Sequence, residues 1–484
     1  MQKNSNATDR TLASDLVVVG GGAAGLACAL AAAETGSARV TVLEKRSATG
    51  GNAARAWGLF AADSPIQKEA LVDARCEDFF KYFMAWSHWK ADPEITRAFV
   101  AKSGDTIRWL EKKGLKFNLV RYYPNQEPPV WHVPEGRGVR LVQLLADRCA
   151  EAGVRIFSDS PGKKILRDGT GTVTGVLAER KGQQFVVPAK TVVIASGGYG
   201  GNPELLKKFC RDYDARMQCL GIPHNGDGLM MALECGAATT DRGLLLTEWP
   251  HVNGDTSAVL STLAREPYTV YVNQRGQRFV DEVQGLHAFQ CANAISRQPD
   301  KAGYILADAA MIRRLEETGA ILGRGNDREA YRREMPGLSR QLDAAAAKNG
   351  ENICVSVEWN EIAKWMDVPA DALLTTIARY NSFCGRGHDE DFYKDRQYLL
   401  PLDQAPYYAI KGQLVFLHTQ GGIKVNAGME VIDRAGNPVP GLYAAGADAG
   451  GWESDTYCDR ISGTALGFAL NSGRIAGENA AKNL

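Results

Sequence analysis

The sequence predicts an α/β protein in which a parallel sheet flanked by helices is interrupted by an inserted α+β domain. A buried strand at 15–20, an alanine-rich helix at 23–35 and a β-branched strand at 38–43 form a βαβ unit of about 30 residues near the start. Residues 242–353 lose this period and carry short strands and helices rich in Arg and Glu. Strands punctuated by glycine return afterwards, so we expect one domain split by one insertion.

The other elements follow from the hydrophobic period and from the turn residues that bound it. We expect helices at 79–90, 93–113, 139–152, 308–318, 328–334 and 463–482, an antiparallel meander at 163–189, and strands at 154–157, 191–198, 268–273, 412–425 and 441–446. The predicted units are a disordered segment at 1–13, a first part at 14–241, a cap at 242–353 and a second part at 354–484.

The composition excludes several classes of protein. The 484 residues include 56 Lys+Arg and 56 Asp+Glu, so the zero net charge offers no electrostatic surface for nucleic acid or an anionic membrane. The 10 cysteines form no CxxC pair, which argues against a zinc ribbon, a disulfide scaffold or a haem attachment site. The uncharged run 16–33 has the length of a membrane span, but it contains four glycines. We therefore expect a cytoplasmic, soluble protein without a membrane span, a metal site or a nucleic-acid partner.

A GxGxxG motif connects the first strand to the first helix. Gly20 allows the tight turn, Gly22 lets the backbone approach a pyrophosphate, and Gly25 lets the helix and strand pack closely. The helix N-terminus offers free N–H groups and partial positive charge to phosphates. Glu44 ends the second strand, 24 residues after Gly20, where a carboxylate can bind ribose hydroxyls. This combination predicts a Rossmann-like dinucleotide site.

Further motifs give a family resemblance. The run 44–52 (EKRSATGGN) turns back sharply, where a plain NAD domain would continue into its next helix. With it, the chain resembles the FAD-binding group of the fumarate reductase and succinate dehydrogenase flavoprotein family. The resemblance extends to a glycine turn at 197–200, a GDG motif at 225–228, a strand along the ribityl chain at 440–446 and a last helix that begins at 462–466. In this family the N-terminus of that helix faces the flavin, so its dipole stabilises the anionic reduced form.

The resemblance implies FAD as the cofactor. The family usually has a carboxylate one position before Asp448, so that group is displaced here or its role is lost. Members with covalent flavin carry a histidine between the acid and the glycine pair; residues 47–49 are Ser-Ala-Thr, which implies non-covalent FAD. The implied FAD-binding residues are Gly20, Gly22, Ala23, Ala24, Gly25, Glu44, Lys45, Gly50, Gly51, Asn52, Gly58, Ser196, Gly197, Gly198, Asp227, Gly446, Asp448, Gly463, Thr464, Ala465 and Leu466.

The substrate residues are also implied by the resemblance. In such reductases a hydride passes from flavin N5 to one alkene carbon, and an acid delivers a proton to the other. The run that begins at His418 resembles the family's HTxGG substrate loop, including Thr419 and Gly421. Arg460 matches the arginine that clamps a carboxylate, a bidentate task that suits a guanidinium. The alternative interpretation is that His418 is an ordinary histidine with satisfied hydrogen bonds and that Arg460 is a surface or ion-pair arginine. Two further substrate ligands are implied by position, His251 and Ser261.

The proton donor departs from the family pattern. The run 273–282 resembles the family's NxxGxRFxNE hairpin, after which the proton-donating arginine is expected at position 286 or 287. This chain has Leu286 and His287 there. His287 is a candidate donor, because imidazole titrates near physiological pH, and Tyr457 is an alternative. The aromatic segment 121–132 forms either a wall for an aromatic substrate or a hydrophobic seam between the domains.

Together these features predict an FAD-dependent, fumarate reductase-like oxidoreductase that reduces or forms a C=C bond conjugated to a carboxylate or carbonyl. The alternatives are a ketosteroid-type or other enone oxidoreductase, and a non-catalytic flavin-binding or electron-transfer protein. No second GxGxxG with a following ribose acid occurs, so the electrons for a small unsaturated substrate are expected from a partner protein or a soluble reductant.

Overall fold

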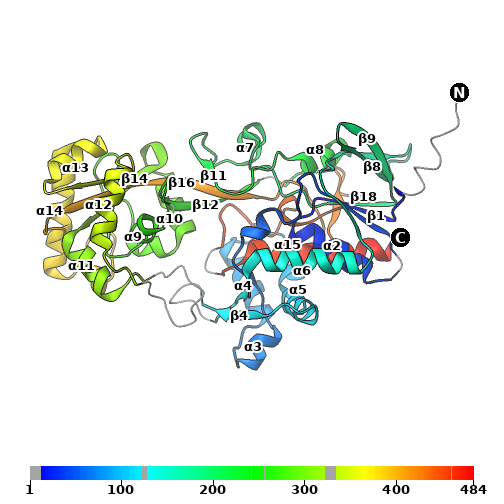
Figure 1. Ribbon diagram of the computed structural model, residues 1–484, viewed down its shortest axis with the longest axis horizontal. Helices are drawn as coiled ribbons and strands as arrows, with labels where there is room; N and C mark the ends of the chain where they lie inside the picture. The colour runs from blue at the N-terminus through cyan, green and yellow to red at the C-terminus, as the bar shows by residue number, and fades with distance from the viewer. Residues whose placement is uncertain are drawn as a thin grey trace.

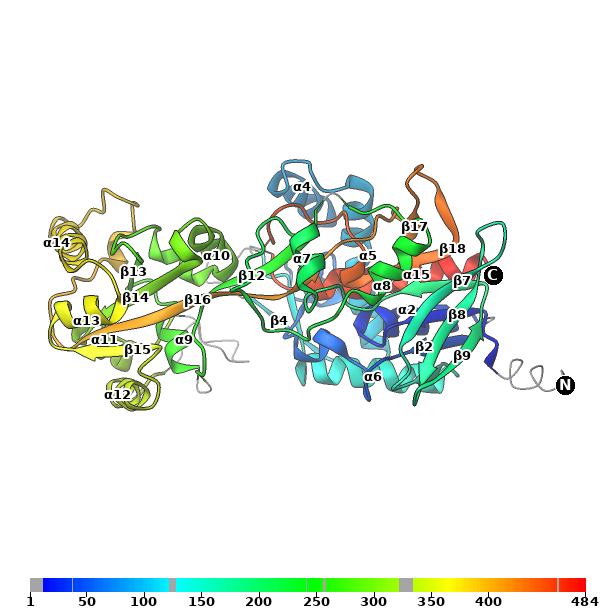
Figure 2. The same ribbon diagram turned by 90° about the horizontal axis from the view of Figure 1, so that it is seen from above.

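The computed structural model describes residues 12–36, 38–121, 128–240, 242–255, 258–321, 334–458 and 461–484. Figure 1 shows two parts side by side, a Rossmann-like domain that carries both chain ends and a cap formed by the middle of the chain. The long strand β16 (Tyr407–Gln420) runs between them in both Figures 1 and 2.

The Rossmann-like domain is built on a six-stranded sheet in the order β17-β18-β10-β1-β2-β6. All its strands are parallel except the edge strand β17. Strand β1 is buried along its whole length, as expected where helices cover both faces of a sheet. The α/β fold class predicted from the sequence is confirmed. The strands are β1 (Leu16–Val19), β2 (Val40–Leu43), β6 (Arg155–Phe157), β10 (Thr191–Ile194), β17 (Glu430–Ile432) and β18 (Pro438–Ala444).

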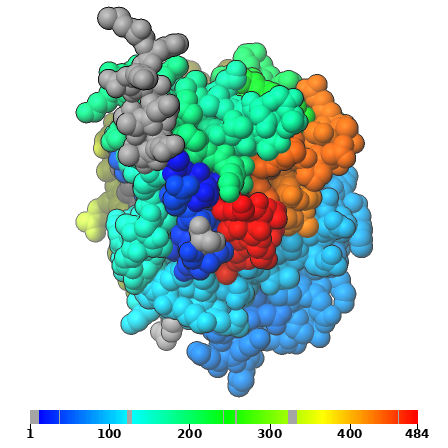
Figure 3. Space-filling view, turned by 90° about the vertical axis from the view of Figure 1, so that its right-hand side faces the viewer, coloured from blue at the N-terminus to red at the C-terminus, as the bar shows by residue number. Residues whose placement is uncertain are grey.

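The first and last long helices pack against each other on this sheet. A Cβ at Gly473 or Gly477 of α15 (Thr464–Lys482) would lie 2.2 Å from a backbone oxygen of α2 (Ala23–Ala33), so glycine permits the close approach. Figure 3, which looks onto the end away from the cap, shows the C-terminal segment beside the N-terminal one. The uncharged run 16–33 thus forms β1 and α2. Across the described ranges, no helix is both long and apolar enough to cross a membrane.

Two small sheets and several further helices belong to the described part of the Rossmann-like domain. Helix α5 (Pro93–Lys112) begins where the Asp92 side chain accepts hydrogen bonds from the backbone N–H groups of Glu94 and Ile95. The small sheets are β3 (Leu59–Phe60), β5 (Trp131–Pro134) and β4 (Phe117–Val120), and the predicted meander of β7 (Gly162–Arg167), β8 (Val173–Arg180) and β9 (Gln183–Pro188). The helices are α3 (Pro65–Glu69), α4 (Cys76–Trp86), α5 (Pro93–Lys112), α6 (Arg137–Glu151), α7 (Pro203–Phe209) and α8 (Asp227–Glu234).

The cap is a mixed sheet gathered around β16. Its other strands are β11 (Gln218–Cys219), β12 (Leu244–His251), β13 (Val270–Asn273), β14 (Ala302–Asp308) and β15 (Ile353–Ser356). Its helices are α9 (Val259–Leu263), α10 (Ala288–Ser296), α11 (Ala309–Thr318), α12 (Leu338–Lys348), α13 (Trp359–Met366) and α14 (Ala370–Arg386).

The cap extends beyond the boundary predicted at residue 353. That residue is the first of β15, which pairs with β16 inside the cap sheet, and α13 and α14 lie at the outer end of the cap (Figures 1 and 2). The sequence carries no linker at the true crossing, because one uninterrupted strand, β16, passes from the cap into the other domain. The predicted helix at 328–334 and the predicted disordered segment at 1–13 lie almost entirely outside the described residues.

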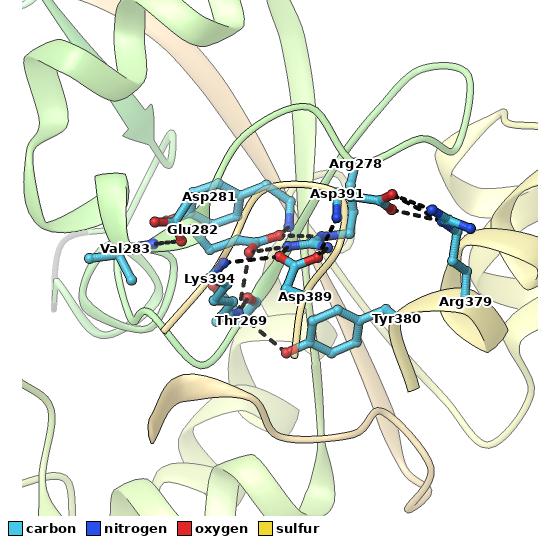
Figure 4. A network of polar contacts seen from close by, with 11 residues as sticks. Thr269, Arg278, Asp281, Glu282, Val283, Arg379, Tyr380, Asp389, Asp391 and Lys394 are labelled. Carbon is cyan, nitrogen blue, oxygen red and sulfur yellow. Dashed lines mark hydrogen bonds and ion pairs between the residues drawn. The ribbon is translucent and has the colours of Figure 1, made fainter. Parts of the chain in front are cut away.

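A buried ionic network holds the hairpin that follows β13 (Figure 4). Arg278 donates to Glu282 over 2.9 and 2.8 Å and to Asp389 over 3.1 and 3.0 Å. The Lys394 ammonium lies 3.3 Å from Glu282 and donates to the Thr269 carbonyl. Burial raises the pKa of Glu282, but Lys394 and Arg278 outweigh burial and hold that pKa below its ordinary value. The hairpin is therefore fixed by paired charges inside the cap.

Candidate active site

A cavity of about 1120 Å³ lies between the two domains and is lined by both. The Rossmann-like domain contributes the glycine turns after β1, β2 and β10, and the cap contributes residues of β12, α9 and α10. Most of the predicted cofactor residues line this cavity. They are Gly20, Gly22, Ala23, Ala24, Glu44, Lys45, Gly50, Gly51, Asn52, Gly58, Ser196, Gly197, Asp227, Gly446, Gly463, Ala465 and Leu466.

The glycines of the first turn differ in what they do. A Cβ at Gly20, where φ is +113°, would lie 2.2 Å from the Ala195 carbonyl oxygen, and one at Gly25 would lie 1.9 Å from the Gly20 oxygen. Both glycines therefore serve the packing of turn, strand and helix. Gly22 instead opens onto the cavity, where a Cβ would meet only the Gly50 oxygen at 3.9 Å. The N-terminus of α2 is thus accessible to a phosphate group.

The acid that ends β2 is held in place by backbone amides. Glu44 is 7% exposed, and its two carboxylate oxygens each accept a hydrogen bond of 2.8 Å, from the N–H groups of Gly21 and Arg46. A carboxylate oxygen has more than one acceptor position, so both remain able to accept from ribose hydroxyls. The next residue, Lys45, pairs with Asp227 of the GDG motif at 2.8 Å, and both line the cavity.

Asp448 lies behind the cavity rather than in its lining. Its carboxylate accepts hydrogen bonds from the backbone N–H groups of Gly197 and Gly198, at 2.9 and 3.1 Å, and from the Ser196 hydroxyl. Burial raises the pKa of Asp448, and these donors act in the opposite direction. Asp448 therefore shapes the glycine turn, whereas Ser196 and Gly197 themselves line the cavity.

The N-terminus of α15 brings a tyrosine to the cavity. Gly463 precedes the helix at φ +82°, where a Cβ would lie 2.7 Å from the Leu59 backbone. The Tyr457 hydroxyl oxygen accepts a hydrogen bond of 3.2 Å from the Ala465 N–H, and its ring packs on Phe289 with centroids 4.8 Å apart. Burial raises the pKa of Tyr457. This phenol therefore keeps its proton while facing the cavity.

His418 and Gln420 of the predicted HTxGG loop line the cavity, whereas Thr419 and Gly421 do not. Its Nδ1 lies 3.0 Å from the Thr419 carbonyl oxygen, and because a carbonyl only accepts, Nδ1 carries the hydrogen. The neutral ring then presents Nε2 as an acceptor, and burial lowers the pKa of His418. The Thr419 hydroxyl oxygen accepts from the Tyr199 N–H, and the Gly421 N–H donates to the Ala447 carbonyl.

Several predicted residues are not in the cavity lining. His251, Ser261 and His287 do not line it, although their chain neighbours Glu248, Thr262 and Ala288 do. Arg460 lies outside the described residues. Among the predicted cofactor residues, those that do not line the cavity are Gly25, Gly198, Asp448 and Thr464.

The lining residues that were not predicted include Glu248, Arg265 and His224. Arg265 donates a hydrogen bond from Nη2 to Oε1 of Glu248, and their side chains are 8% and 15% exposed. His224 lies against Gly197, and burial lowers its pKa to about 4, so its ring is neutral near pH 7. None of the three belongs to a glycine motif or to the HTxGG loop, so the sequence carried no spacing signal for them.

The lining fits a flavin dinucleotide. An accessible helix N-terminus, an acid anchored at the end of β2 and three glycine turns surround one cavity, and these are the features that bind a dinucleotide. Gly22 and Gly51 leave room along its wall, where a Cβ would lie 3.9 and 3.7 Å from the nearest atom, whereas Gly446 packs closely on Ala24, which a Cβ would approach to 2.8 Å.

Comparison with known proteins agrees with this fit. The chain matches the FAD binding domain family over residues 15–457. The vinyl phenol reductase of Lactiplantibacillus plantarum is 32% identical over 483 residues, which cover 97% of this chain and 96% of that protein. The fumarate reductase (cytochrome) of Shewanella frigidimarina is 28% identical over 476 residues, which cover 97% of this chain and 77% of that protein.

Solved structures give the same result. The structure of the 3-ketosteroid-Δ4-(5α)-dehydrogenase of Rhodococcus jostii, in complex with 4-androstene-3,17-dione, matches this chain with a TM-score of 0.74 and 25% identity. The match covers 97% of this chain and 96% of the dehydrogenase chain. The open conformation of a flavocytochrome c3 fumarate reductase has a TM-score of 0.73 and 26% identity and covers 97% of this chain and 78% of that chain. The predicted family and the predicted enzyme class are confirmed: the chain belongs to the FAD binding domain family and is an FAD-dependent oxidoreductase of the fumarate reductase type.

Proposed function

We propose that the protein reduces, or in the reverse direction forms, a C=C bond conjugated to a carboxylate or carbonyl, with FAD bound non-covalently. The observation that carries this proposal is the single cavity that joins the glycine turns of the Rossmann-like domain to polar and aromatic side chains of the cap. Relatives named as fumarate, urocanate and vinyl phenol reductases support the same chemistry.

Tyr457 is the side chain that we propose as the proton donor. When bound, FAD supplies a hydride from N5 to one alkene carbon, and the other carbon then requires a proton. Tyr457 lines the cavity, and burial keeps its phenol protonated. After donation, the phenolate oxygen would accept from the Ala465 N–H in the first turn of α15, where the helix dipole favours negative charge.

His287 remains the alternative donor. It directly precedes Ala288 and Phe289, which line the cavity. The variants Tyr457→Phe and His287→Gln distinguish the two side chains. We expect Tyr457→Phe to lower the rate of alkene reduction at least 100-fold, the usual contribution of a general acid, with unchanged anaerobic flavin reduction by dithionite. A Tyr457→Phe rate within threefold of wild type, together with a 100-fold loss in His287→Gln, would assign the proton to His287.

His418 is proposed to bind the anionic end of the substrate together with Arg460. Because burial lowers the pKa of His418, the free enzyme holds a neutral ring near pH 7. A carboxylate close to Nε2 favours the imidazolium, so substrate binding takes up a proton and weakens as the pH rises. His418→Gln should remove this pH dependence of KM.

One experiment tests the proposed activity. The purified protein is reduced anaerobically with dithionite, and the reoxidation of its flavin is followed after addition of fumarate, urocanate, cinnamates or 3-ketosteroids. Reoxidation by a carboxylate-conjugated alkene supports the proposal, and reoxidation by 3-ketosteroids alone assigns the enone alternative, which the Rhodococcus jostii structure favours. If the protein is yellow but no alkene reoxidises its flavin, the result supports the electron-transfer alternative. A colourless protein would refute flavin binding.

The remaining proposals concern the cofactor linkage and the electron source. Residues 47–49 offer no histidine to the flavin, so acid precipitation should release all of it into the supernatant. We propose that a partner protein or a soluble reductant delivers the electrons, and that the protein acts in the cytoplasm.

A further inference from the structure

The cap forms one wall of the cavity, and the formal charges on this wall cancel. The cap wall is defined here as the described residues of β12, α9 and α10, and of the turn after α9, that line the cavity: Leu246, Glu248, Thr262, Arg265, Ala288 and Phe289. Only Glu248 and Arg265 among these six are charged, and they pair with each other. The remaining cap-wall side chains are mostly apolar.

The Glu248–Arg265 pair disfavours the binding of a substrate anion at the cap wall. A substrate carboxylate that approached Arg265 would have to compete with the protein carboxylate already bound to it. It would also lie next to Glu248 in a site where both protein side chains are at most 15% exposed, so solvent screens the repulsion weakly. A like charge against a buried carboxylate strongly disfavours binding.

The same pair suits a hydroxyl group. An ionised carboxylate only accepts hydrogen bonds, and a hydroxyl is a donor that brings no charge. Hydrogen bonds to an ionised acceptor are about twice as strong as those between neutral groups. Glu248 therefore favours the binding of a neutral hydrogen-bond donor at the position where it repels an anion.

Apolar and aromatic side chains surround this polar pair. Phe289 of the cap wall packs on Tyr457, and Tyr457 is bound to the start of α15. Close to the same helix start, Trp131 covers Gly58, where a Cβ would lie 2.7 Å from the indole nitrogen. The Rossmann-like domain adds further apolar residues to the cavity: Ile66, Val72, Leu119 and Val120. Such a lining favours a flat, apolar framework with one polar group.

We propose that the substrate is an alkene conjugated to a hydroxylated aromatic ring, that its hydroxyl donates a hydrogen bond to Glu248, and that Glu248 excludes a carboxylate from the cap wall. This proposal rests on the proposed function, because it names the substrate of the same site. 4-Hydroxycinnamate also carries the carboxylate that the proposed function names, and 4-vinylphenol presents the same hydroxylated ring without it. Glu248 is thus a specificity-determining residue rather than a proton donor.

The test compares four alkenes as oxidants of the anaerobically reduced protein: 4-hydroxycinnamate, cinnamate, 4-vinylphenol and fumarate. For the wild type we expect 4-hydroxycinnamate to exceed cinnamate at least tenfold in kcat/KM and fumarate to be the poorest oxidant. Glu248→Gln keeps the size of the side chain and removes its charge. It should reduce the preference for the hydroxyl to less than threefold and raise kcat/KM for fumarate at least tenfold. The 4-vinylphenol arm shows whether the second end must be a carboxylate.

Two variants and one binding measurement keep the test interpretable. Glu390→Gln removes a cap carboxylate that pairs with Arg386 on the surface, and it should leave all four rates unchanged. Glu248→Asp keeps the charge and should still exclude fumarate. Binding of 3-(4-hydroxyphenyl)propionate to the oxidised protein, followed by the flavin difference spectrum, should weaken at least tenfold in Glu248→Gln. This readout does not depend on turnover and also shows that the variant has folded with its flavin.

Each failure has a separate meaning. If no alkene reoxidises the wild-type flavin, the proposed function itself is wrong. If the wild type reduces fumarate as well as 4-hydroxycinnamate, or if Glu248→Gln leaves the ratio of the two unchanged, the proposed function stands and the role of Glu248 is refuted.

Discussion

Replacing Arg278 with methionine removes the only arginine in the part of the buried cap network that the structure describes. Four hydrogen bonds, of 2.8 to 3.1 Å, join this guanidinium to Glu282 and Asp389, whose side chains are 0% exposed. Methionine fills part of the volume but leaves two carboxylates with one remaining cation, Lys394. Breaking a buried ion pair in this way costs about 3–5 kcal/mol of folding free energy.

Arg379→Met is the matched control for this prediction. Arg379 also pairs with an aspartate of the same loop, Asp391, as Figure 4 shows, but it is 54% exposed. An exposed pair contributes about 1 kcal/mol or less. Urea unfolding of the two variants and the wild type, followed by tryptophan fluorescence, measures both differences. An Arg278→Met protein within 1 kcal/mol of Arg379→Met would refute the reasoning that burial makes this network costly to break.

Two further predictions concern stability and cofactor binding. Burial lowers the pKa of His132 to about 4, so the unfolded chain binds more protons than the folded one between pH 6.5 and 4. His132 therefore contributes about 3 kcal/mol above pH 6.5, which is lost as the pH falls to 4, and melting temperatures of wild type and His132→Gln should converge over that range. Gly25→Ala places a methyl group 1.9 Å from the Gly20 oxygen, so the purified variant should contain less than a tenth of the wild-type flavin; full flavin content would contradict the packing argument.

Most of the residues that the sequence predicted for the cofactor half of the site line the cavity. The turn glycines and Glu44 lie within one βαβ unit, so spacing along the chain fixes their places in space. The family resemblance also implied Lys45 and Asp227 as cofactor residues, and both line the cavity, although their ion pair joins residues far apart in the chain. Asp448 shows the limit, because a carboxylate one position from the family pattern turns toward the backbone of the glycine turn.

The sequence was insufficient for the cap half. Glu248 and Arg265 become partners only when the end of β12 meets the turn after α9, and neither position belongs to a motif. At the start of α10, a shift of one residue along a helix rotates a side chain by about 100°, which separates His287 from the lining residue Ala288. The end of the cap escaped prediction because the chain leaves it along a strand and not through a linker.

That strand has a mechanical consequence. Residues 407–413 of β16 pair with cap strand β14, and residues 415–416 pair with β11, while His418 lines the cavity. A rotation of the cap relative to the Rossmann-like domain would therefore bend or drag the backbone that carries His418. Because β16 joins the cap to His418, the movement that opens the cleft to admit a substrate also moves the imidazole that is proposed to receive it.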